Sequence, residues 1–359
     1  MRFLPALAGV LVLLAAVPGC VTRPERSDVA TPFMFRSLNL REQDAQGRPA
    51  WSVTSPEARY DLNRRIATAV HPIGVIYAAG QPLYQLDAQR ATVINDGDVI
   101  QLEGAVIIRR LGPRPVRIEA ERLRWYPARS WIDIEHRPSI REGLSRIRAD
   151  RASIDLRKEM VLLHGQPVYE RWLQPMAGDG APSPSTAPPP LRLQASQASW
   201  SMDTGLWTAA GPIRGERRIA GEAAPQTLLA SAMQGDAKQD SLELLAPVAF
   251  RDPGRSTVVN TGELRMDLGG QRLRSDQAVT ATIGNLRVRG SSLRVDLGST
   301  VAVIPAACRI EQSGLELRAG LCRWNWISGG IEAQRDVILK QAGSGQITRS
   351  QSLTGSLGA

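Results

Sequence analysis

Apolar and polar residues alternate along most of this chain. The longest clear run covers residues 100–109, where Ile100, Leu102, Val106 and Ile108 alternate with polar or small neighbours. Shorter runs of the same kind occupy residues 116–121, 286–290, 293–297 and 315–321. A period of two is the signature of strands with one buried face. The best helix-period window, residues 56–65, also fits a turn that leads into a strand. The pattern therefore predicts an all-β, antiparallel fold.

A short internal repeat accompanies this alternation. The pattern apolar-x-small-x-x-apolar recurs in order at residues 53–58, 86–91, 118–123, 147–152, 193–198, 228–233, 273–278 and 317–322. The first copies begin about 30 residues apart, a period typical of stacked supersecondary units. Such stacking predicts an elongated, twisted antiparallel β-jelly-roll with an apolar groove inside it.

The N-terminal segment has the features of an export signal. Residues 3–17 are uninterruptedly apolar and end in Val-Pro-Gly-Cys at Cys20. The stretch is short for a membrane span of about 20 residues and has the proportions of a secretory signal. A small residue followed by Cys resembles the lipobox of bacterial lipoproteins, so we expect Cys20 to be lipidated. Pro18 departs from the usual small residue, which leaves an uncleaved signal anchor as the alternative.

Composition breaks divide the rest of the chain. Residues 21–30 are polar and aperiodic, residues 177–190 are rich in Pro, and residues 342–359 are rich in Gly, Ser and Gln. The expected organisation is a signal peptide with lipobox at 1–20, a tether at 21–30, a first β lobe at 31–176, a linker or loop at 177–190, a second β-repeat lobe at 191–341 and a flexible tail at 342–359.

Charge and cysteine content narrow the class of protein. The formal net charge is +9, but Arg residues are dispersed singly along the predicted strands. This dispersal argues against a nucleic-acid-binding arm. Export would place Cys308 and Cys322 in an oxidising compartment, where a disulfide between them is the natural pairing. Two unpaired buried thiols are the alternative.

Motifs for catalysis and for metal binding are absent from the sequence. It contains no phosphate-binding loop, no GxSxG and no HExxH, and His71, His136 and His164 are scattered without ligand spacing. Asp96-Gly97-Asp98 fits a hairpin turn better than a calcium loop. Residues 324–326, Trp-Asn-Trp, fit core packing better than a carbohydrate platform. We therefore expect no enzyme, no cofactor and no metal.

The opening residues resemble a known family. Phe33-x-Phe35 is followed by Leu-x-Leu-Arg-Glu-Gln-Asp at 38–44, a Gly-x-Pro-x-Trp-x-Val turn and strand at 47–53, and Ser-Pro-x-Ala-x-Tyr at 55–60. Together with Leu-Glu-Gly-x-Val at 102–106, these residues are similar to LptC, a component of the lipopolysaccharide export bridge. Beyond residue 150 the likeness is only to the β-repeats shared by LptC, LptA and LptD, and the chain is about twice the length of the short LptC form.

The resemblance implies a location, a mechanism and partners. The location is the periplasmic face of the inner membrane, with the protein anchored there by its N-terminal segment. The ligand is lipopolysaccharide or a related glycolipid, received from an inner-membrane ABC transporter and passed to an LptA-like bridge protein through paired edge strands. Alternation selects the expected groove residues: Ile100, Leu102, Val106, Ile108, Ile118, Ile132 and Ile134.

Two other hypotheses remain open from the sequence. In the first, the chain is a structural envelope lipoprotein that binds a protein partner through strand edges and carries no lipid. An open apolar channel would favour lipid transfer over this hypothesis, and a fully packed core would favour this hypothesis. In the second, the chain is a glycan-active enzyme, with Asp133 and Glu135 on one strand face, but no second carboxylate site opposes them.

Overall fold

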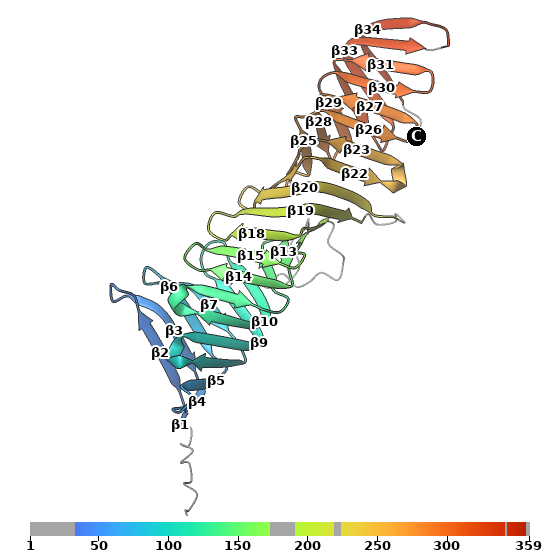
Figure 1. Ribbon diagram of the computed structural model, residues 1–359. Helices are drawn as coiled ribbons and strands as arrows, with labels where there is room; N and C mark the ends of the chain where they lie inside the picture. Colours follow the sequence, from blue (N-terminus) through green and yellow to red (C-terminus); the bar gives the residue numbers. More distant parts are fainter. Residues whose placement is uncertain (1–32, 173–190, 219–223, 342, 357–359) are drawn as a thin grey trace, which may run out of the picture. The chain divides into compact units, whose positions relative to one another are not determined.

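The computed structural model describes residues 33–172, 191–218, 224–341 and 343–356 (Figure 1). The described residues form β-strands joined by turns and corners, with three short 3-10 helices, η1 (Asn95–Gly97), η2 (Pro127–Arg129) and η3 (Pro253–Arg255). The paired strands between β1 and β34 run antiparallel to their neighbours. The antiparallel, all-β class predicted from the alternation is confirmed.

The strands form two hydrogen-bonded walls. Apart from the six long strands described next, which lie between some of them, the strands of the β1 wall are, in order, β1 (Phe33–Phe35), β4 (Glu57–Asp61), β5 (Ile66–Val70), β8 (Arg90–Ile94), β11 (Trp131–Ile134), β14 (Arg151–Asp155), β15 (Met160–His164), β18 (Gln197–Ser201), β21 (Ser241–Leu245), β24 (Leu264–Asp267), β25 (Arg272–Ser275), β28 (Leu293–Asp296), β29 (Val301–Ile304) and β32 (Leu321–Asn325). Those of the β2 wall are β2 (Leu38–Gln43), β3 (Pro49–Ser55), β6 (Ile73–Ala78), β7 (Gln81–Asp87), β12 (Ser139–Glu142), β13 (Ser145–Arg148), β16 (Val168–Arg171), β17 (Leu191–Gln194), β22 (Val248–Asp252), β23 (Thr257–Thr261), β26 (Val279–Ile283), β27 (Leu286–Gly290), β30 (Cys308–Gln312) and β31 (Leu315–Ala319).

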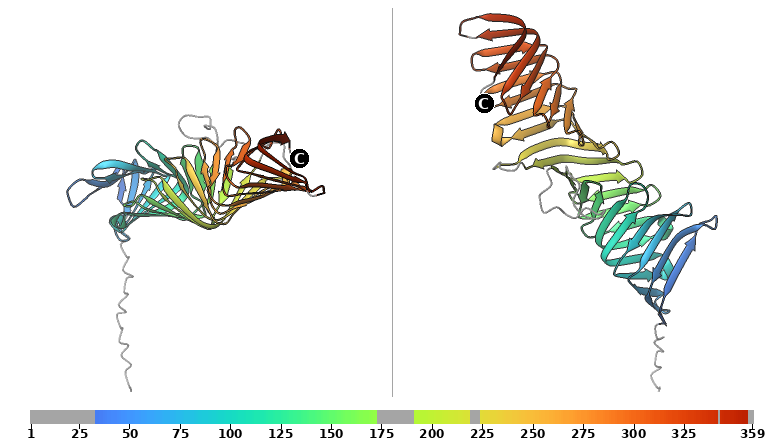
Figure 2. Two further views of the ribbon diagram at one scale, coloured as in Figure 1. Left: turned by 90° about the horizontal axis from the view of Figure 1, so that it is seen from above. Right: turned by 180° about the vertical axis from the view of Figure 1, so that it is seen from behind.

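Six long strands belong to both walls. They are β9 (Val99–Arg110) with β10 (Val116–Tyr126), β19 (Leu206–Arg217) with β20 (Gln226–Asp236), and β33 (Gly330–Gln341) with β34 (Ile347–Ser356). The first part of β9 pairs with β8 in the β1 wall, and its last part pairs with β7 in the β2 wall. Each pair bends in its middle, so the two walls meet along one edge and diverge from it (Figure 2). We call the space between the walls the trough, and its open edge, which is lined by turns, the mouth.

The bend needs a special backbone. Gly104, in the middle of β9, has φ +77°, and a Cβ there would lie 2.4 Å from Oε1 of Gln89. Any larger residue would clash at this position and would also adopt an unfavourable backbone conformation. Arg335 and Asp336 take positive φ at the same place in β33. Local backbone conformation thus fixes where β9 and β33 turn from one wall into the other.

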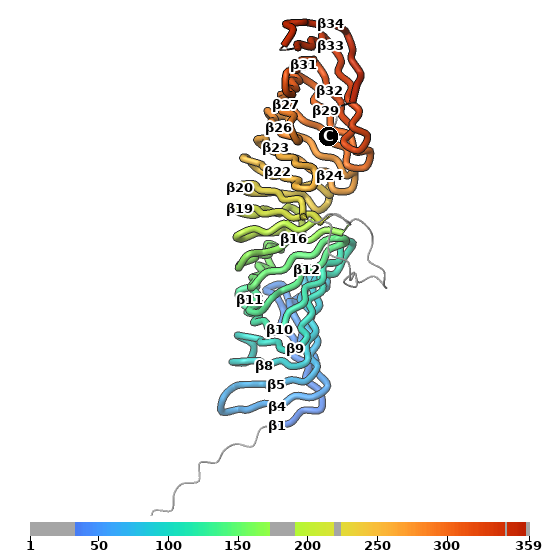
Figure 3. Tube along the Cα trace, turned by 90° about the vertical axis from the view of Figure 1, so that its right-hand side faces the viewer, coloured from blue at the N-terminus to red at the C-terminus, as the bar shows by residue number. Residues whose placement is uncertain are grey.

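The eight copies of the short repeat mark the closed edge. Six copies lie where the chain passes from one wall to the other, for example from β7 to β8 and from β17 to β18, and two lie at the bends of β10 and β20. The small residue of several copies is buried, as at Ala149, Ala195 and Ser275. Small side chains are required here because the two walls approach most closely at their shared edge. Figure 3 lets the successive corners be followed along the chain.

Two expectations are settled by the strand register. Residues 56–65, the best helix-period window, hold β4 and its following turn. The flexible tail expected at residues 342–359 was wrong in part, because residues 347–356 form β34, paired with β33 along its length. Ladder hydrogen bonds use backbone groups alone, so a polar, mostly exposed sequence can complete a sheet without an apolar pattern.

Candidate functional site

An open cavity lies between the walls in the C-terminal part of the described chain. Its volume is about 470 Å³. On the β2 wall, a row of paired inward residues lines it: Val259, Ala281, Val288 and Ile310. The facing row on the β1 wall is Met266, Leu273, Val295, Ala302 and Trp324. Paired residues point to the same side of a sheet, so each wall offers a continuous apolar strip.

Small side chains leave this part of the trough open. Ala281 and Ala302 occupy central positions of the two strips, and Val259, Val288 and Val295 are only half-buried. The lining is therefore apolar surface left without a packing partner in the described chain, which is the usual character of a ligand pocket.

The mouth of the cavity is polar on the β2 wall. Arg171, Arg217, Gln226, Asp252 and Thr257 lie at one level along this wall and line the cavity. Asp252 is 4 % exposed and accepts a hydrogen bond of 2.7 Å from Nε2 of Gln226. Its second partner is the guanidinium of Arg255, at 3.0 Å. The site is thus apolar within and hydrogen-bonding at its rim, which suits an amphiphile.

The C-terminal end of the cavity is aromatic. Trp324 and Trp326 line it on the β1 wall, and Ile327 beside them is 65 % exposed. The indole N–H of Trp324 is buried without a hydrogen-bond partner among the described residues. The Trp-Asn-Trp segment therefore contributes to a cavity wall and not only to core packing.

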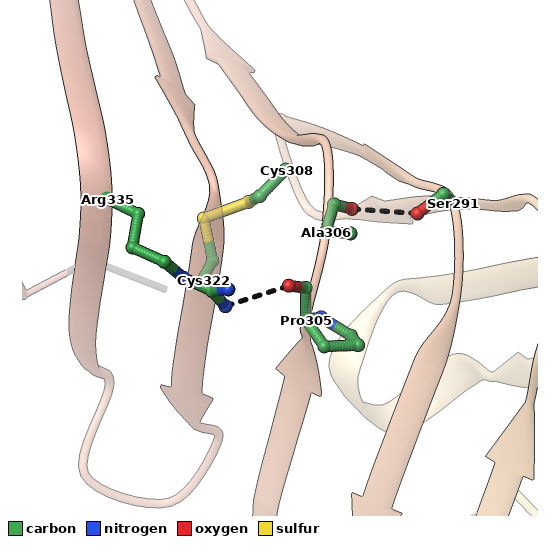
Figure 4. The surroundings of a disulfide bond; sticks show 6 residues. All are labelled: Ser291, Pro305, Ala306, Cys308, Cys322 and Arg335. Atoms are coloured by element: carbon green, nitrogen blue, oxygen red, sulfur yellow. Dashed lines mark hydrogen bonds between the residues drawn. A yellow bond between two sulfur atoms is a disulfide. The ribbon is translucent and has the colours of Figure 1, made fainter.

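A disulfide joins the walls at the closed edge of the cavity. Cys308 of β30 and Cys322 of β32 are bonded with a Cα–Cα separation of 5.9 Å, and Cys322 lines the cavity (Figure 4). Next to it, Arg335 donates a 2.9 Å hydrogen bond to the carbonyl of Pro305. This is the pairing that the sequence favoured, and it fixes the two walls to each other at the floor of the trough.

The seven groove residues expected from the sequence lie elsewhere in the trough. They are between 0 and 4 % exposed and belong to the packed core of the N-terminal part: Ile100, Leu102, Val106, Ile108, Ile118, Ile132 and Ile134. Their side chains point inward, but none of them lines the cavity. The cavity-lining rows show the same alternation at residues 286–290 and 293–297. The sequence therefore predicted which side chains point inward, but not where the space between the walls is open.

Ion pairs shift the pKa of several carboxyl groups. Hydrogen bonds from Tyr60 and Arg65 lower the pKa of Asp96, in the turn of η1. The guanidinium of Arg274 lowers the pKa of Asp276. Burial raises the pKa of Glu142, although the neighbouring Arg114 acts in the opposite direction. None of these groups lines the cavity, so their role is in the outer faces and the mouth of the trough.

Several expectations concern residues outside the described ranges. Cys20, the signal segment, the tether and the Pro-rich linker all lie there, and so they stay predictions. Within the described ranges, no three His, Cys, Asp or Glu side chains are grouped to hold a metal ion. No described helix is long and apolar enough to cross a membrane.

Comparison with known proteins finds a family model that matches part of the chain. Residues 6–169 match the model of the family described as "Lipopolysaccharide-assembly, LptC-related", which is fewer than half of the 359 residues. The resemblance to LptC is confirmed over this stretch. Curated protein sequences gave no match.

Two solved structures show limited likeness. LptH of Pseudomonas aeruginosa, the LptA-homologous periplasmic component of a lipopolysaccharide transport device, is 10 % identical, with a TM-score of 0.27, over 37 % of this chain and 90 % of that chain. The extracellular domain of a one-component system from B. thetaiotaomicron is 8 % identical, with a TM-score of 0.10, over 89 % of this chain and 77 % of that chain.

Proposed function

We propose that this chain, whose residues 6–169 match the LptC family, is a lipopolysaccharide export component that holds acyl chains in the cavity between its walls. The observation that carries the proposal is the cavity itself, with about 470 Å³ between two apolar strips and a polar mouth on one side. Acyl chains would lie against Val288 and Val295, and the sugar head group would remain at the mouth. Apolar surface left without a partner gains most from such an occupant.

The strand pairing supports a lipid over a peptide inside the trough. The strands that line the cavity are hydrogen-bonded to neighbours on both sides, as β26 is to β23 and β27. Their backbone N–H and C=O groups are already used, so an extended peptide could not add to the sheet there. An occupant of the cavity is therefore bound by apolar contact, which a hydrocarbon chain provides without burying unpaired polar groups.

The ends of the walls supply surfaces for partners. β1 is an edge strand whose Phe33, Met34 and Phe35 are 50 %, 65 % and 44 % exposed, and β34 is the other end of the ladder (Figure 1). Unpaired edges are suited to strand addition. In this proposal the β1 end meets the membrane transporter and the β34 end meets a bridge protein, on the periplasmic face of the inner membrane. The chain performs no catalysis, and the transporter supplies the driving force.

The second candidate function uses the edges alone. A structural envelope lipoprotein would bind proteins through β1 and β34 and leave the trough unoccupied. The tightly packed N-terminal core favours this candidate, because its inward side chains leave no room for a ligand. The two candidates differ in what occupies the C-terminal cavity, and that occupancy can be measured directly.

Site-specific photocrosslinking tests the proposal. A benzophenone amino acid at Val295, which lines the cavity, is expected to give lipopolysaccharide adducts in cells. The same residue at the neighbouring Arg294, which points outward and is exposed, is the matched control and gives none. A folded, expressed protein without adducts at Val295 would leave only the structural candidate.

A cavity-filling pair of variants adds a second test. Ala281→Phe places a large ring in the cavity, whereas Thr282→Phe places it on the outer face of the same strand. We expect the first to lower adduct yield at Val295 by about tenfold, since it occupies the space of the chain, and the second to leave it unchanged. Equal yields from both variants would contradict occupancy of this cavity.

A further inference from the structure

Two aromatic rings stack across the trough near the N-terminal end of the cavity, and they line the small void beside it. Tyr169 of β16 stacks on Trp207 of β19, with ring centroids 5.4 Å apart and planes inclined by 21°. Tyr169 belongs to the β2 wall and Trp207 to the part of β19 that pairs in the β1 wall, so the stack crosses the trough. Both side chains are 9 % exposed. This stack is a direct contact between the walls.

An ion pair spans the mouth beside the stack. Nη2 of Arg171, at the end of β16, lies 2.6 Å from Oδ2 of Asp240, in the turn between β20 and β21. The hydroxyl of Ser145 joins the two contacts, at 3.0 Å from the Tyr169 hydroxyl and 3.2 Å from Nη1 of Arg171. Arg171 itself lines the cavity. The closing contacts therefore begin where the open space ends.

The trough continues on the other side of these contacts. A residual void of about 20 Å³ lies there, lined by inward residues of both walls, among them Ile147, Leu163 and Trp200. Farther along, the same inward rows fill the space completely, as at Ile132 and Ile154, each 0 % exposed. The two sides of these contacts are thus one trough with one set of inward rows. The rows are filled on the N-terminal side and, past the buried Leu193 and Leu242, open into the cavity on the other.

We propose that Tyr169, Trp207, Arg171 and Asp240 form a gate between the open cavity and the closed N-terminal section of the trough. The inference rests on the proposed function, since it concerns the same apolar ligand. When the stack and the ion pair separate, an acyl chain in the cavity extends past Leu163 and between the packed walls. The void beside Leu163 is the first space that it enters.

Opening the gate costs the ion pair at the mouth. Asp240 is 34 % exposed and Arg171 13 % exposed, so the pair is only partly screened by water. An inserted hydrocarbon chain covers the apolar side chains that the opening exposes, so little apolar surface meets water. Opening without a ligand has no such compensation. The gate is therefore closed in the empty protein, and with ligand present it is open in only a minor fraction of molecules, which weakening its contacts increases.

Photocrosslinking on both sides of the gate tests this inference. Full-length protein carries the benzophenone residue at Leu163 or at Val295 and is mixed with purified lipopolysaccharide. In the otherwise unchanged protein, we expect adducts at Val295 and few at Leu163. Asp240→Asn, which keeps the shape of the side chain and removes its charge, should raise the Leu163 adducts about threefold to fivefold. Trp207→Ala, which removes the stack, should raise them by about tenfold.

A matched control separates the gate from a general effect of charge removal. Asp276 has a side-chain exposure of 36 %, close to that of Asp240, and it pairs with Arg274 and Arg294 outside the cavity. Asp276→Asn should leave the Leu163 adducts unchanged. Circular dichroism establishes that each variant is folded, so a changed adduct yield reports on the gate.

The outcomes distinguish the gate from the proposed function. Adducts at Val295 with unchanged Leu163 yields in both Asp240→Asn and Trp207→Ala would overturn the gate and leave the lipid site intact. Strong Leu163 adducts without any substitution would also overturn it, because the partition would then close nothing. Absence of adducts at Val295 would overturn the proposed function and, with it, the gate.

Discussion

The two sections of the trough share one plan and differ in what fills it. Before the gate, paired inward rows such as Leu102, Leu123 and Ile134 are large and fully covered. After it, Val and Ala occupy the middle of the corresponding rows, between larger residues such as Met266 and Trp324, and the space between the walls stays open. Strand direction, corner design and wall pairing are the same in both sections. The volume of the inward side chains therefore contributes to whether the space between the walls is a packed core or an open cavity.

The largest expected effect comes from removing the same side chain in each section. Leu163, 0 % exposed before the gate, and Leu273, half-buried in the cavity wall, are both inward leucines. Leu163→Ala should lower the free energy of unfolding by about 3 kcal/mol, because it leaves a void in a packed core. Leu273→Ala should cost about 1 kcal/mol, because the space around it is already open. Denaturant unfolding of the two variants makes the measurement. Equal losses would mean that the cavity is collapsed in solution.

A smaller effect is expected from the disulfide, which belongs to the open section alone. Replacing both Cys308 and Cys322 by Ser should cost about 2 to 3 kcal/mol, since the bond closes a short loop in the unfolded chain. Hydrogen exchange should accelerate in β30 to β33 and stay unchanged in β9 to β14. Acceleration spread evenly over both sections would show that they unfold as one unit. It would contradict a difference in local stability between the two sections.

The smallest effect concerns acid. The pKa of Glu243, Asp276, Asp296 and Glu316, all after the gate, is lowered by hydrogen bonds or ion pairs. A lowered pKa stabilises the fold above the unfolded value, near 4, and this contribution disappears as the pH falls through the folded value. Burial raises the pKa of Glu142, before the gate, so its contribution has the opposite sign and is lost as the pH rises.

Before the gate, Asp44 and Asp96 also have a lowered pKa, but four such groups lie after it. The open section should therefore lose more stability than the closed section when the pH falls below about 4. Tryptophan fluorescence reports this if the signal of Trp324 and Trp326 changes at a higher pH than that of the buried Trp125. Single-tryptophan variants separate the two signals. Simultaneous changes in both would contradict the assignment of acid sensitivity to the open section.

Much of this architecture was readable from the amino-acid sequence. Alternation at residues 100–109 placed Ile100 and Ile108 on the inward face. The eight small-residue repeats predicted stacked units, and the structure places them at the closed edge between the walls. The pairing of Cys308 with Cys322 followed from their presence as the two remaining cysteines in a chain expected to be exported. These features depend on local spacing or on simple counting, which a single sequence contains.

The position of the cavity was not readable in the same way. Alternation tells which side chains point inward, but the width of the gap depends on what faces them from the other wall. Tyr169 and Trp207, or Arg171 and Asp240, are far apart in sequence and meet only through the stacking of many strands. The sequence did not predict β34 for another reason. Its pairing with β33 relies on backbone groups, so its residues show no apolar pattern.

The three long, bent strand pairs act as ribs of this trough. Each rib is a single hydrogen-bonded ribbon that crosses both walls, so changing the angle between the walls at a rib would strain its backbone. Between ribs, the walls are linked by short corners and by side chains. The cavity occupies the span between the β19–β20 rib and the β33–β34 rib. In mechanical terms, cargo of variable girth would lie between two stiff ribs, where the walls are tied at the floor by the disulfide and can spread at the mouth.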